Sequence, residues 1–486
     1  MAEDHRTHNS WQQPERSPAP GNTELPEPSL KPGQGLYTSV ANLAWPASLE
    51  FLIITSIIFA DILFLSRLGT EILAGVGIAV TVFRIFYEPF NSVALATTTV
   101  VAQAYGARNK DLACQGAGQS VLLALILGFI SGGIGVLVAR LAMIAMGGEG
   151  LVRESGVLYM QINLMASPFY AVALAGGGAL KGVGDTRTPM LYTLAGAILK
   201  IALSAGLVFG LWGFPELGVK GAAIGSVCGY GLNALLIALK LSRGFDGMRL
   251  GVRAFLPDFG LLWRIIRLAW PVAAERMVMR MGFIFYMRVV AALGTVVLAA
   301  NQIALRLESV SLTVGFGFTI AATTLVGQAV GRRDLKSAHE NAWATMKLSV
   351  AVAAVMTVVL ILIRHWAVAM FRPDADVREI AVSCLVIGAF ELPAFAVLFT
   401  FAGALRGAGD TRSPMIVALI GTFIFRLPLV YLLGVYFGLG LKGIWYGTLI
   451  DWIGRATLMY FIFRSGRWKD KAFVEDEEIA RPLKKI

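Results

Sequence analysis

The sequence predicts an all-α polytopic membrane protein, with twelve transmembrane helices arranged as two parallel six-helix lobes. Of its 486 residues, 56% are apolar and only 15% are charged, whereas soluble proteins carry about 25% charged residues. Apolar runs of about 20 residues, the length that spans a bilayer as a helix, recur along the chain. Since backbone exposed to lipid must satisfy its own hydrogen bonds, these runs are predicted to be helices.

A motif that occurs twice predicts the two lobes. Leu180–Met190, LKGVGDTRTPM, returns as Leu405–Met415, LRGAGDTRSPM, and its central aspartates are 225 residues apart (410 − 185). The same offset relates further pairs: Trp45 and Trp270, Glu50 and Glu275, Gln103 and Gln328, and Gly106 and Gly331. The chain is therefore one six-span unit written twice. Because six is even, both halves cross the membrane in the same direction, around an axis along the membrane normal.

Twelve apolar segments are the predicted spans. They lie at 38–66, 72–100, 118–145, 156–180, 189–212, 218–241, 262–291, 297–327, 341–368, 378–404, 414–437 and 442–464. They divide the chain into a disordered cytoplasmic tail (1–36), an N-lobe with helices 1–6 (37–245), a cytoplasmic inter-lobe linker (246–261), a C-lobe with helices 7–12 (262–464) and a second cytoplasmic tail (465–486). The first tail is rich in Pro, Ser, Glu and Gln and has no apolar period, which is typical of disorder.

The distribution of basic residues predicts the orientation. The net charge is +11, which in a soluble protein would suggest a nucleic-acid partner. Here, with the N-terminus placed in the cytoplasm, the cytoplasmic loops hold about twice as many basic residues as the outer loops, as the positive-inside rule requires. We therefore expect a multi-pass protein of the inner or plasma membrane, with both termini cytoplasmic, the lipid bilayer and no nucleic acid as partner, and a monomeric state.

The repeated motif has the composition of a turn that leads into a helix. Glycine permits the tight turn, Thr188 and Ser413 suit N-cap positions, and proline suits the first helical position. The aspartates can cap donors exposed at the same turn. We interpret the motif as structural, and its arginines as anchors at the cytoplasmic interface. The structural residues are Gly184, Asp185, Pro189, Gly409, Asp410 and Pro414.

The same motif carries a family resemblance. It follows the fourth span of each half and, together with Leu43–Pro46 in the first span and Leu298–Leu305 in the eighth, resembles the multidrug and toxic compound extrusion (MATE) family, bacterial type. The resemblance covers about residues 37–465. It implies an H+- or Na+-coupled antiporter that exports small amphipathic, often cationic, drugs or metabolites by alternating access between two lobes. It implies no cofactor besides the coupling ion.

Two ionisable residues inside spans are the predicted coupling site. A charge at the centre of a span costs about 2.5–3.5 kcal/mol on insertion scales and therefore indicates a function. Asp61 matches the first-span aspartate that the family uses for proton or cation coupling, and Tyr286 stands at its repeat position. Lys200 stands where archaeal relatives place a polar partner of this acid. We expect Lys200 to pair with Asp61 or, alternatively, to snorkel to a lipid headgroup.

Three further acids are candidates for binding a substrate or a cation. Glu50 and Glu275 are repeat-equivalent, each four residues after a Trp-Pro proline. Equally, they could satisfy backbone groups that the proline frees. Glu391, beside Pro393, is the third, because some family members carry coupling acids in spans seven and ten. Other intramembrane charges are expected to form internal ion pairs, among them Arg84 with Glu88, four residues apart on one helix.

Other functions fit less well, with one exception. A lipid-linked oligosaccharide flippase stays open as the alternative, because buried basic residues suit an anionic phosphate. A major-facilitator transporter fits poorly, since the loop Gly106–Asp111 lacks that family's element. An enzyme is not expected, because the chain has no HExxH or GxSxG motif and no clustered His or Cys. Neither catalytic residues nor a metal site are therefore expected.

Overall fold

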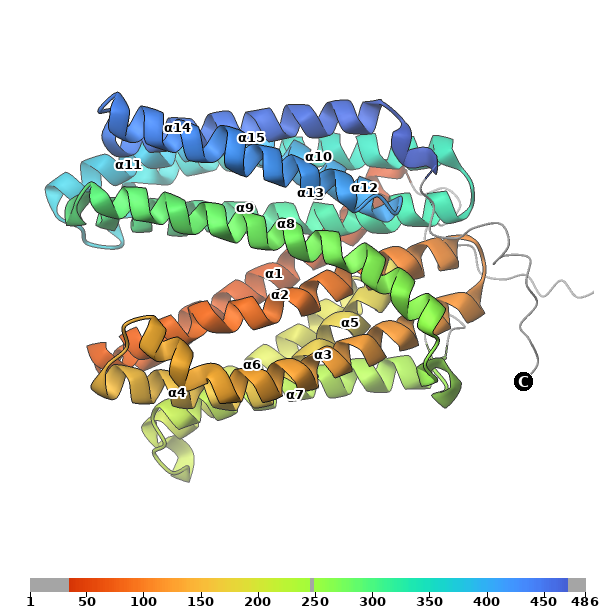
Figure 1. Cartoon of the computed structure of the whole chain (residues 1–486), viewed down its shortest axis with the longest axis horizontal. Helices are drawn as coiled ribbons and strands as arrows, with labels where there is room; N and C mark the ends of the chain where they lie inside the picture. The colour runs from red at the N-terminus through yellow and green to blue at the C-terminus, as the bar shows by residue number, and fades with distance from the viewer. Residues whose placement is uncertain (1–34, 245–248, 471–486) are drawn as a thin grey trace, which may run out of the picture.

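A computed structural model describes residues 35–244 and 249–470 of the chain. The predicted disordered tail, but for its last two residues, and most of the second tail lie outside these residues. Within them, helices without strands form two bundles (Figure 1). The N-lobe bundle comprises α1 (Leu36–Ser66), α2 (Thr70–Gly106), α3 (Lys110–Ala145), α4 (Gly150–Met165), α5 (Ser167–Val183), α6 (Arg187–Phe209) and α7 (Val219–Arg243).

The C-lobe bundle repeats this order with more interruptions. It comprises α8 (Phe259–Ala292), α9 (Thr295–Gly331), α10 (Leu335–Ala369), α11 (Ala375–Ala389), α12 (Glu391–Gly407), α13 (Arg412–Ile420), η3 (Gly421–Arg426), α14 (Leu427–Tyr431), η4 (Leu432–Tyr436) and α15 (Gly440–Arg464). Short helical turns are η1 (Leu211–Gly213), η2 (Val252–Phe255) and η5 (Arg467–Asp470). The segments η3 and η4 are π-helical. One cause is Pro428, which lacks the N–H that would donate to the carbonyl four residues earlier.

The twelve predicted spans are present as helical segments. Eight of them, and two bent pairs of helices, are long and apolar enough to cross a membrane. The other two, α8 and α15, are 34 and 25 residues long but carry several charged side chains, which lowers their hydropathy. Glu275 of α8 and Asp451 and Arg455 of α15 are buried, whereas the exposed charges Arg267, Arg288, Lys442 and Arg464 lie toward the ends of these helices. The two helices therefore still fit a membrane-embedded bundle.

The fourth span of each repeat is bent, whereas a single helix is predicted at 156–180 and at 378–404. The two helices meet at 50° between α4 and α5 and at 42° between α11 and α12. Pro168 and Pro393 occupy equivalent positions just after the bend, and neither can donate a backbone hydrogen bond. In the C-lobe the hydroxyl of Thr357 donates to the carbonyl of Ala389 at 2.7 Å, the group that Pro393 leaves free.

The repeated motif forms the predicted turn in both halves, with two corrections. Gly184 has a φ of 105°, and the carboxylate of Asp185 accepts a hydrogen bond from the N–H of Thr188 at 2.9 Å. However, α6 begins at Arg187 with Thr186 at the N-cap position, so Thr188 lies in the first turn rather than at the N-cap. Proline is accordingly the third helical residue rather than the first. The C-lobe repeats this arrangement at Gly409, Asp410, Arg412 and Ser413.

The two lobes contact each other on the side where the described chain begins and ends, which we call the terminal side (right in Figure 1). α1 packs against α9, and its repeat equivalent α8 packs against α2. At the crossing of α2 and α9 the backbones touch: a Cβ on Gly331 would lie 2.0 Å from the carbonyl oxygen of Gln103, and one on Gly106 would lie 2.1 Å from that of Gln328. Only glycine fits at these two positions.

Hydrogen bonds across this contact follow the repeat. Carbonyls at the C-terminus of a helix have no partner further along it, and here side chains of the other lobe donate to them. The four bonds are Thr99 to the carbonyl of Arg406 (3.1 Å), Thr324 to that of Lys181 (2.8 Å), Gln103 to that of Gly407 (2.8 Å) and Gln328 to that of Gly182 (3.0 Å). The ends of α5 and α12 are thus tied to the opposite lobe.

Candidate functional site

Asp61 and Lys200 form a buried ion pair inside the N-lobe. The Nζ atom of Lys200 lies 2.6 Å from a carboxylate oxygen of Asp61, and the side chains are 5% and 15% exposed. The hydroxyl of Tyr159 donates a further hydrogen bond to Asp61. The ammonium of Lys200 lies 6.0 Å from the ring centre of Tyr230, a position that favours a cation. The predicted pairing is confirmed, and Lys200 does not snorkel.

Glu50 and Glu275 form repeat-equivalent ion pairs with the basic residue of the motif. Lys181 lies 2.9 Å from the carboxylate of Glu50, and Arg406 lies 2.6 Å from that of Glu275. Arg406 donates to both oxygens and is 2% exposed. This corrects the interface prediction for Arg406, because a buried carboxylate needs a charged partner close by. For Arg187 and Arg412, which are exposed, the interface role stays a prediction. A role of either acid in binding a cation stays a prediction.

The C-lobe holds a different group of buried charges. Glu391 is the first residue of α12, at the bend, where it accepts a hydrogen bond from the hydroxyl of Thr448 and shares another with Glu308 of α9. Glu308 therefore lies against another acid inside the C-lobe, rather than against a basic residue.

Asp451 on α15 joins two arginines beside this acid pair. Its carboxylate lies 2.8 Å from Arg426 and 2.6 Å from Arg455. The guanidinium of Arg426 also lies 4.7 Å from the ring centre of Trp452. Sequence reasoning missed Asp451 and Arg455. Their spacing of four residues inside a span, which places opposite charges together on a helix, was the signal available.

Glu88 of α2 pairs across the lobe boundary. Its carboxylate contacts Arg280 of α8, and Arg276, one turn away on the same helix, lies at 3.9 Å. The predicted salt bridge with Arg84 on α2 is therefore replaced by one between the lobes. A side chain on the neighbouring lobe cannot be inferred from spacing along one helix, which explains why the sequence pointed to the local partner.

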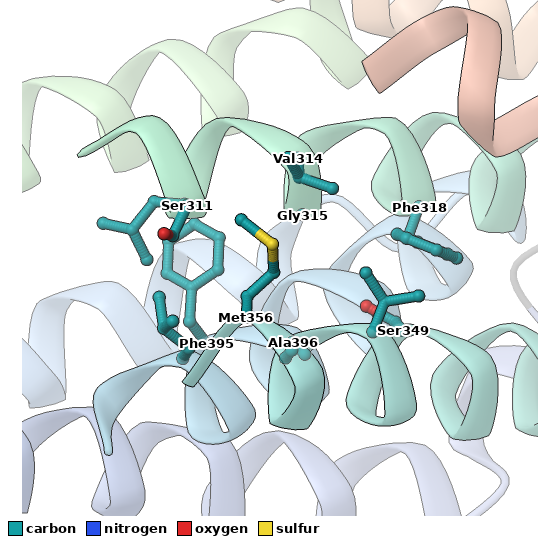
Figure 2. A pocket seen from close by; sticks show the side chains of 12 residues that line it. Ser311, Val314, Gly315, Phe318, Ser349, Met356, Phe395 and Ala396 are labelled. Atoms are coloured by element: carbon teal, nitrogen blue, oxygen red, sulfur yellow. The ribbon is translucent and has the colours of Figure 1, made fainter. Parts of the chain in front are cut away.

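A small cavity in the C-lobe lies between α9, α10 and α12 (Figure 2). Its volume is about 20 Å³, and its lining is apolar except for the hydroxyls of Ser311 and Ser349. Pockets for drug-sized ligands enclose about 300–1,000 Å³, whereas a space of this size holds a single water. The cavity is therefore a packing defect and does not receive a substrate in this conformation.

Residues 46–205 and 271–432 each match the MatE family model. The two matched segments start at Pro46 and Pro271, separated by the offset of the internal repeat, and together they cover more than half of the chain. The chain belongs to the MatE family. The predicted family resemblance is thereby confirmed, and with it a multi-pass membrane transporter, because MatE proteins are membrane transporters rather than enzymes.

Relatives of this MatE chain align over nearly their whole length. A probable multidrug resistance protein NorM of Thermotoga maritima is 30% identical over 442 residues, which cover 90% of this chain and 94% of that protein. The multidrug resistance protein PmpM of Pseudomonas aeruginosa is 26% identical, with 89% and 93% covered. A solved MATE family transporter in an outward-facing conformation shares the fold, with a TM-score of 0.84 and 23% identity over 89% of this chain and 96% of that one.

The predicted site residues of this MatE chain fall in three places rather than one. Asp61 and Lys200 lie inside the N-lobe. Glu50 and Glu275 lie near the lobe contact, on α1 and α8, which pack against the opposite lobe. Glu391 lies inside the C-lobe. The structure therefore separates a candidate coupling pair from the surfaces at which the lobes meet.

Proposed function

We propose that this chain is an antiporter that exports small amphipathic organic compounds in exchange for H+ or Na+, with Asp61 and Lys200 as its coupling pair. The observation that carries the proposal is the ion pair buried inside the N-lobe. Tyr286 and Phe425 stand at the equivalent positions of the C-lobe, so fold symmetry does not explain the pair. Removing the charge from one member of a buried pair leaves the other uncompensated, at a cost of about 3–5 kcal/mol.

The position of α1 links this pair to the lobe contact. α1 carries Asp61 and packs against α6, which carries Lys200. It also packs against α9 of the other lobe. Nearer the terminal side, the hydroxyl of Ser48 on α1 donates to the carbonyl of Val314 on α9 at 2.8 Å. A proton or Na+ bound to Asp61 neutralises its charge, weakens the attraction to Lys200 and releases α1 from α6. The same helix then shifts against α9, which changes the contact between the lobes.

The names of the relatives, multidrug resistance proteins, support drugs or metabolites as substrates, often cationic as the family resemblance implies. We also propose that the chain is a monomer of the inner or plasma membrane with both termini in the cytoplasm, which the basic loops support. A lipid-linked oligosaccharide flippase stays the alternative function.

The test is transport of a fluorescent amphipathic dye by the full chain in proteoliposomes, with an imposed H+ or Na+ gradient. Wild type should accumulate or expel the dye under one of these gradients. Asp61→Asn should only equilibrate it, because an amide cannot take up the coupling ion. Tyr286→Phe, at the equivalent depth in the C-lobe, is the matched control and should retain gradient-driven transport. Normal transport by Asp61→Asn under both gradients would disprove the coupling role.

A second variant tests the partner. Lys200→Met removes the cation that holds Asp61 in its ionised form, so we expect the pH profile of transport to shift relative to wild type. An unchanged profile would show that Lys200 has only a packing role.

A further inference from the structure

The helix faces at which the lobes meet continue as exposed faces away from the terminal side. On α9, a Cβ on Gly317 would lie 2.5 Å from the carbonyl oxygen of Ala44 on α1. Arg306 lies eleven residues earlier, three turns along the same face, and is exposed. On α2, Glu88 reaches α8, and Gly77, again eleven residues earlier, is exposed, so that a Cβ on it would have nothing within 4 Å. The lobes therefore diverge along these helices and leave a gap between them.

The charged side chains on these faces are mostly arginines. Arg276 and Arg280 of α8 contact Glu88 of α2 across the boundary and remain about one third exposed. Arg84, also exposed, interacts electrostatically with both Arg280 and Glu88. With Arg306, this gives four positive charges, which Glu88 offsets by one. We call these four arginines the gap arginines.

The number of charges indicates that the gap arginines face water rather than lipid. A guanidinium in the hydrocarbon core is costly unless it is paired or reaches a water-filled cavity, and one carboxylate cannot pair with four. Apolar side chains are interleaved with them on the same helices, namely Ile85, Ile284 and Val310, which are 39–63% exposed. The gap thus presents cationic forks next to apolar surface.

We propose that the gap between the lobes binds amphipathic organic anions, with the carboxylate, sulfonate or phosphate bound by gap arginines and the apolar body against the interleaved side chains. Guanidinium forks match the geometry of such anions. The carboxylate of Glu88 forms an ion pair with Arg280 in this structure, so a bound anion competes with Glu88 for that arginine. The inference rests on the proposed export function and assigns it a substrate class of the opposite charge to the one that the family resemblance implies.

The test is equilibrium binding to the detergent-solubilised full chain, which needs no ion gradient. The probes are two xanthene dyes of similar size, anionic fluorescein and a cationic rhodamine ester, followed by fluorescence anisotropy. We expect wild type to bind the anion at least about tenfold more tightly. Arg306→Gln and Arg84→Gln should each weaken anion binding about tenfold, the effect of one charge-assisted hydrogen bond, and leave cation binding unchanged. Glu88→Gln should strengthen anion binding, because it removes the competitor.

Arg140→Gln is the matched control, because Arg140 is an exposed arginine of α3, outside the four helices that line the gap. It should bind both dyes as wild type does. Tighter binding of the cation, or wild-type anion binding by both Arg306→Gln and Arg84→Gln, would overturn the proposal. Asp61→Asn should keep its anion affinity even if it loses gradient-driven transport, so failure of the coupling proposal and failure of this one are distinguishable.

A second arm distinguishes the source of the anionic group. In proteoliposomes, movement of a fluorescent phosphatidylglycerol between leaflets is compared with that of the matching phosphatidylcholine. Faster movement of the anionic lipid that Arg306→Gln abolishes would assign the bound group to a lipid headgroup. Equal rates, together with tighter fluorescein binding, would assign it to a soluble organic anion.

Discussion

At the lobe contact the two halves of this chain are nearly the same molecule, whereas inside the lobes they differ. Both copies keep a glutamate paired with the basic residue of the motif, Glu50 with Lys181 and Glu275 with Arg406. By contrast, the N-lobe interior holds Asp61 with Lys200, at positions where the C-lobe has an aromatic residue. The repeat is therefore retained at the crossing of α2 and α9 and in the ion pairs of the motif, and it is lost inside the lobes. The pair of Glu88 and Arg280 is an exception at the boundary, because Thr313 and Thr55 stand at the equivalent positions.

Geometry explains the difference. At a two-fold contact each residue of one lobe meets the equivalent region of the other, so a change in one copy disturbs a surface that both copies share. Inside a lobe no such coupling exists. Tyr159 and Tyr230 of the N-lobe correspond to Cys384 and Arg455 of the C-lobe, and each set packs with its own partners. The interiors are thus where the two lobes can acquire separate functions.

The largest effect is expected from a substitution that breaks the charge group found in the C-lobe but not in the N-lobe. Asp451→Asn leaves Arg426 and Arg455 buried without their shared carboxylate, and the loss of one partner from a buried charge group costs about 3–5 kcal/mol. We expect a large fall in the melting temperature of the detergent-solubilised protein. Ser226→Ala, at the equivalent N-lobe position, is the control and should cost about 1 kcal/mol or less. Equal losses for both variants would contradict the asymmetry.

The sequence predicted the shared parts of the molecule better than the divergent parts. The repeat offset identified both lobes, the turn at Asp185 and the equivalence of Glu50 and Glu275, because each of these features occurs in both halves of the sequence. The pair of Asp61 and Lys200 was also predicted, because the family resemblance places a partner of the first-span acid at the position of Lys200. The sequence did not reveal that Glu308 meets Glu391 or that Glu88 meets Arg280. These contacts join different helices, and their geometry depends on packing that the spacing along one helix does not encode.

A second, smaller effect tests the symmetry of the lobe contact. Gly331→Ala and Gly106→Ala each place a methyl group against a backbone carbonyl of the other lobe, which cannot move aside as a flexible side chain would. We expect each substitution to lower the free energy of unfolding by about 1–3 kcal/mol, and the two by similar amounts. Thermal unfolding measures both. Gly77→Ala is the control on the same helix as Gly106, where a Cβ has open space, and it should stabilise by up to about 1 kcal/mol. A large difference between Gly331→Ala and Gly106→Ala would show that the contact is not energetically symmetric.

The smallest effect concerns two equivalent helix caps on the terminal side. Asn109 caps α3 by accepting a hydrogen bond from the N–H of Leu112 at 3.0 Å, and Asp334 caps α10 in the same way from Ser337 at 2.9 Å. Only the second cap titrates. The hydroxyl and the N–H of Ser337 hold the pKa of the Asp334 carboxyl below its ordinary value of 3.8. A lowered pKa means that this carboxylate stabilises the fold above about pH 3.8, and that the stabilisation is lost as the pH falls through the lowered pKa.

Asp334→Asn should therefore lower stability at neutral pH by about 0.3–1 kcal/mol, the value of a negative charge at a helix N-terminus. Asn109→Asp should raise it by a similar amount, since it gives the N-lobe the charge that the C-lobe already has. The differences in melting temperature from wild type should be constant above about pH 5 and shrink as the pH falls from 4 to 3, reaching zero only below the lowered pKa. Differences that stay constant from pH 7 to pH 3 would mean that the two caps differ in packing rather than in charge.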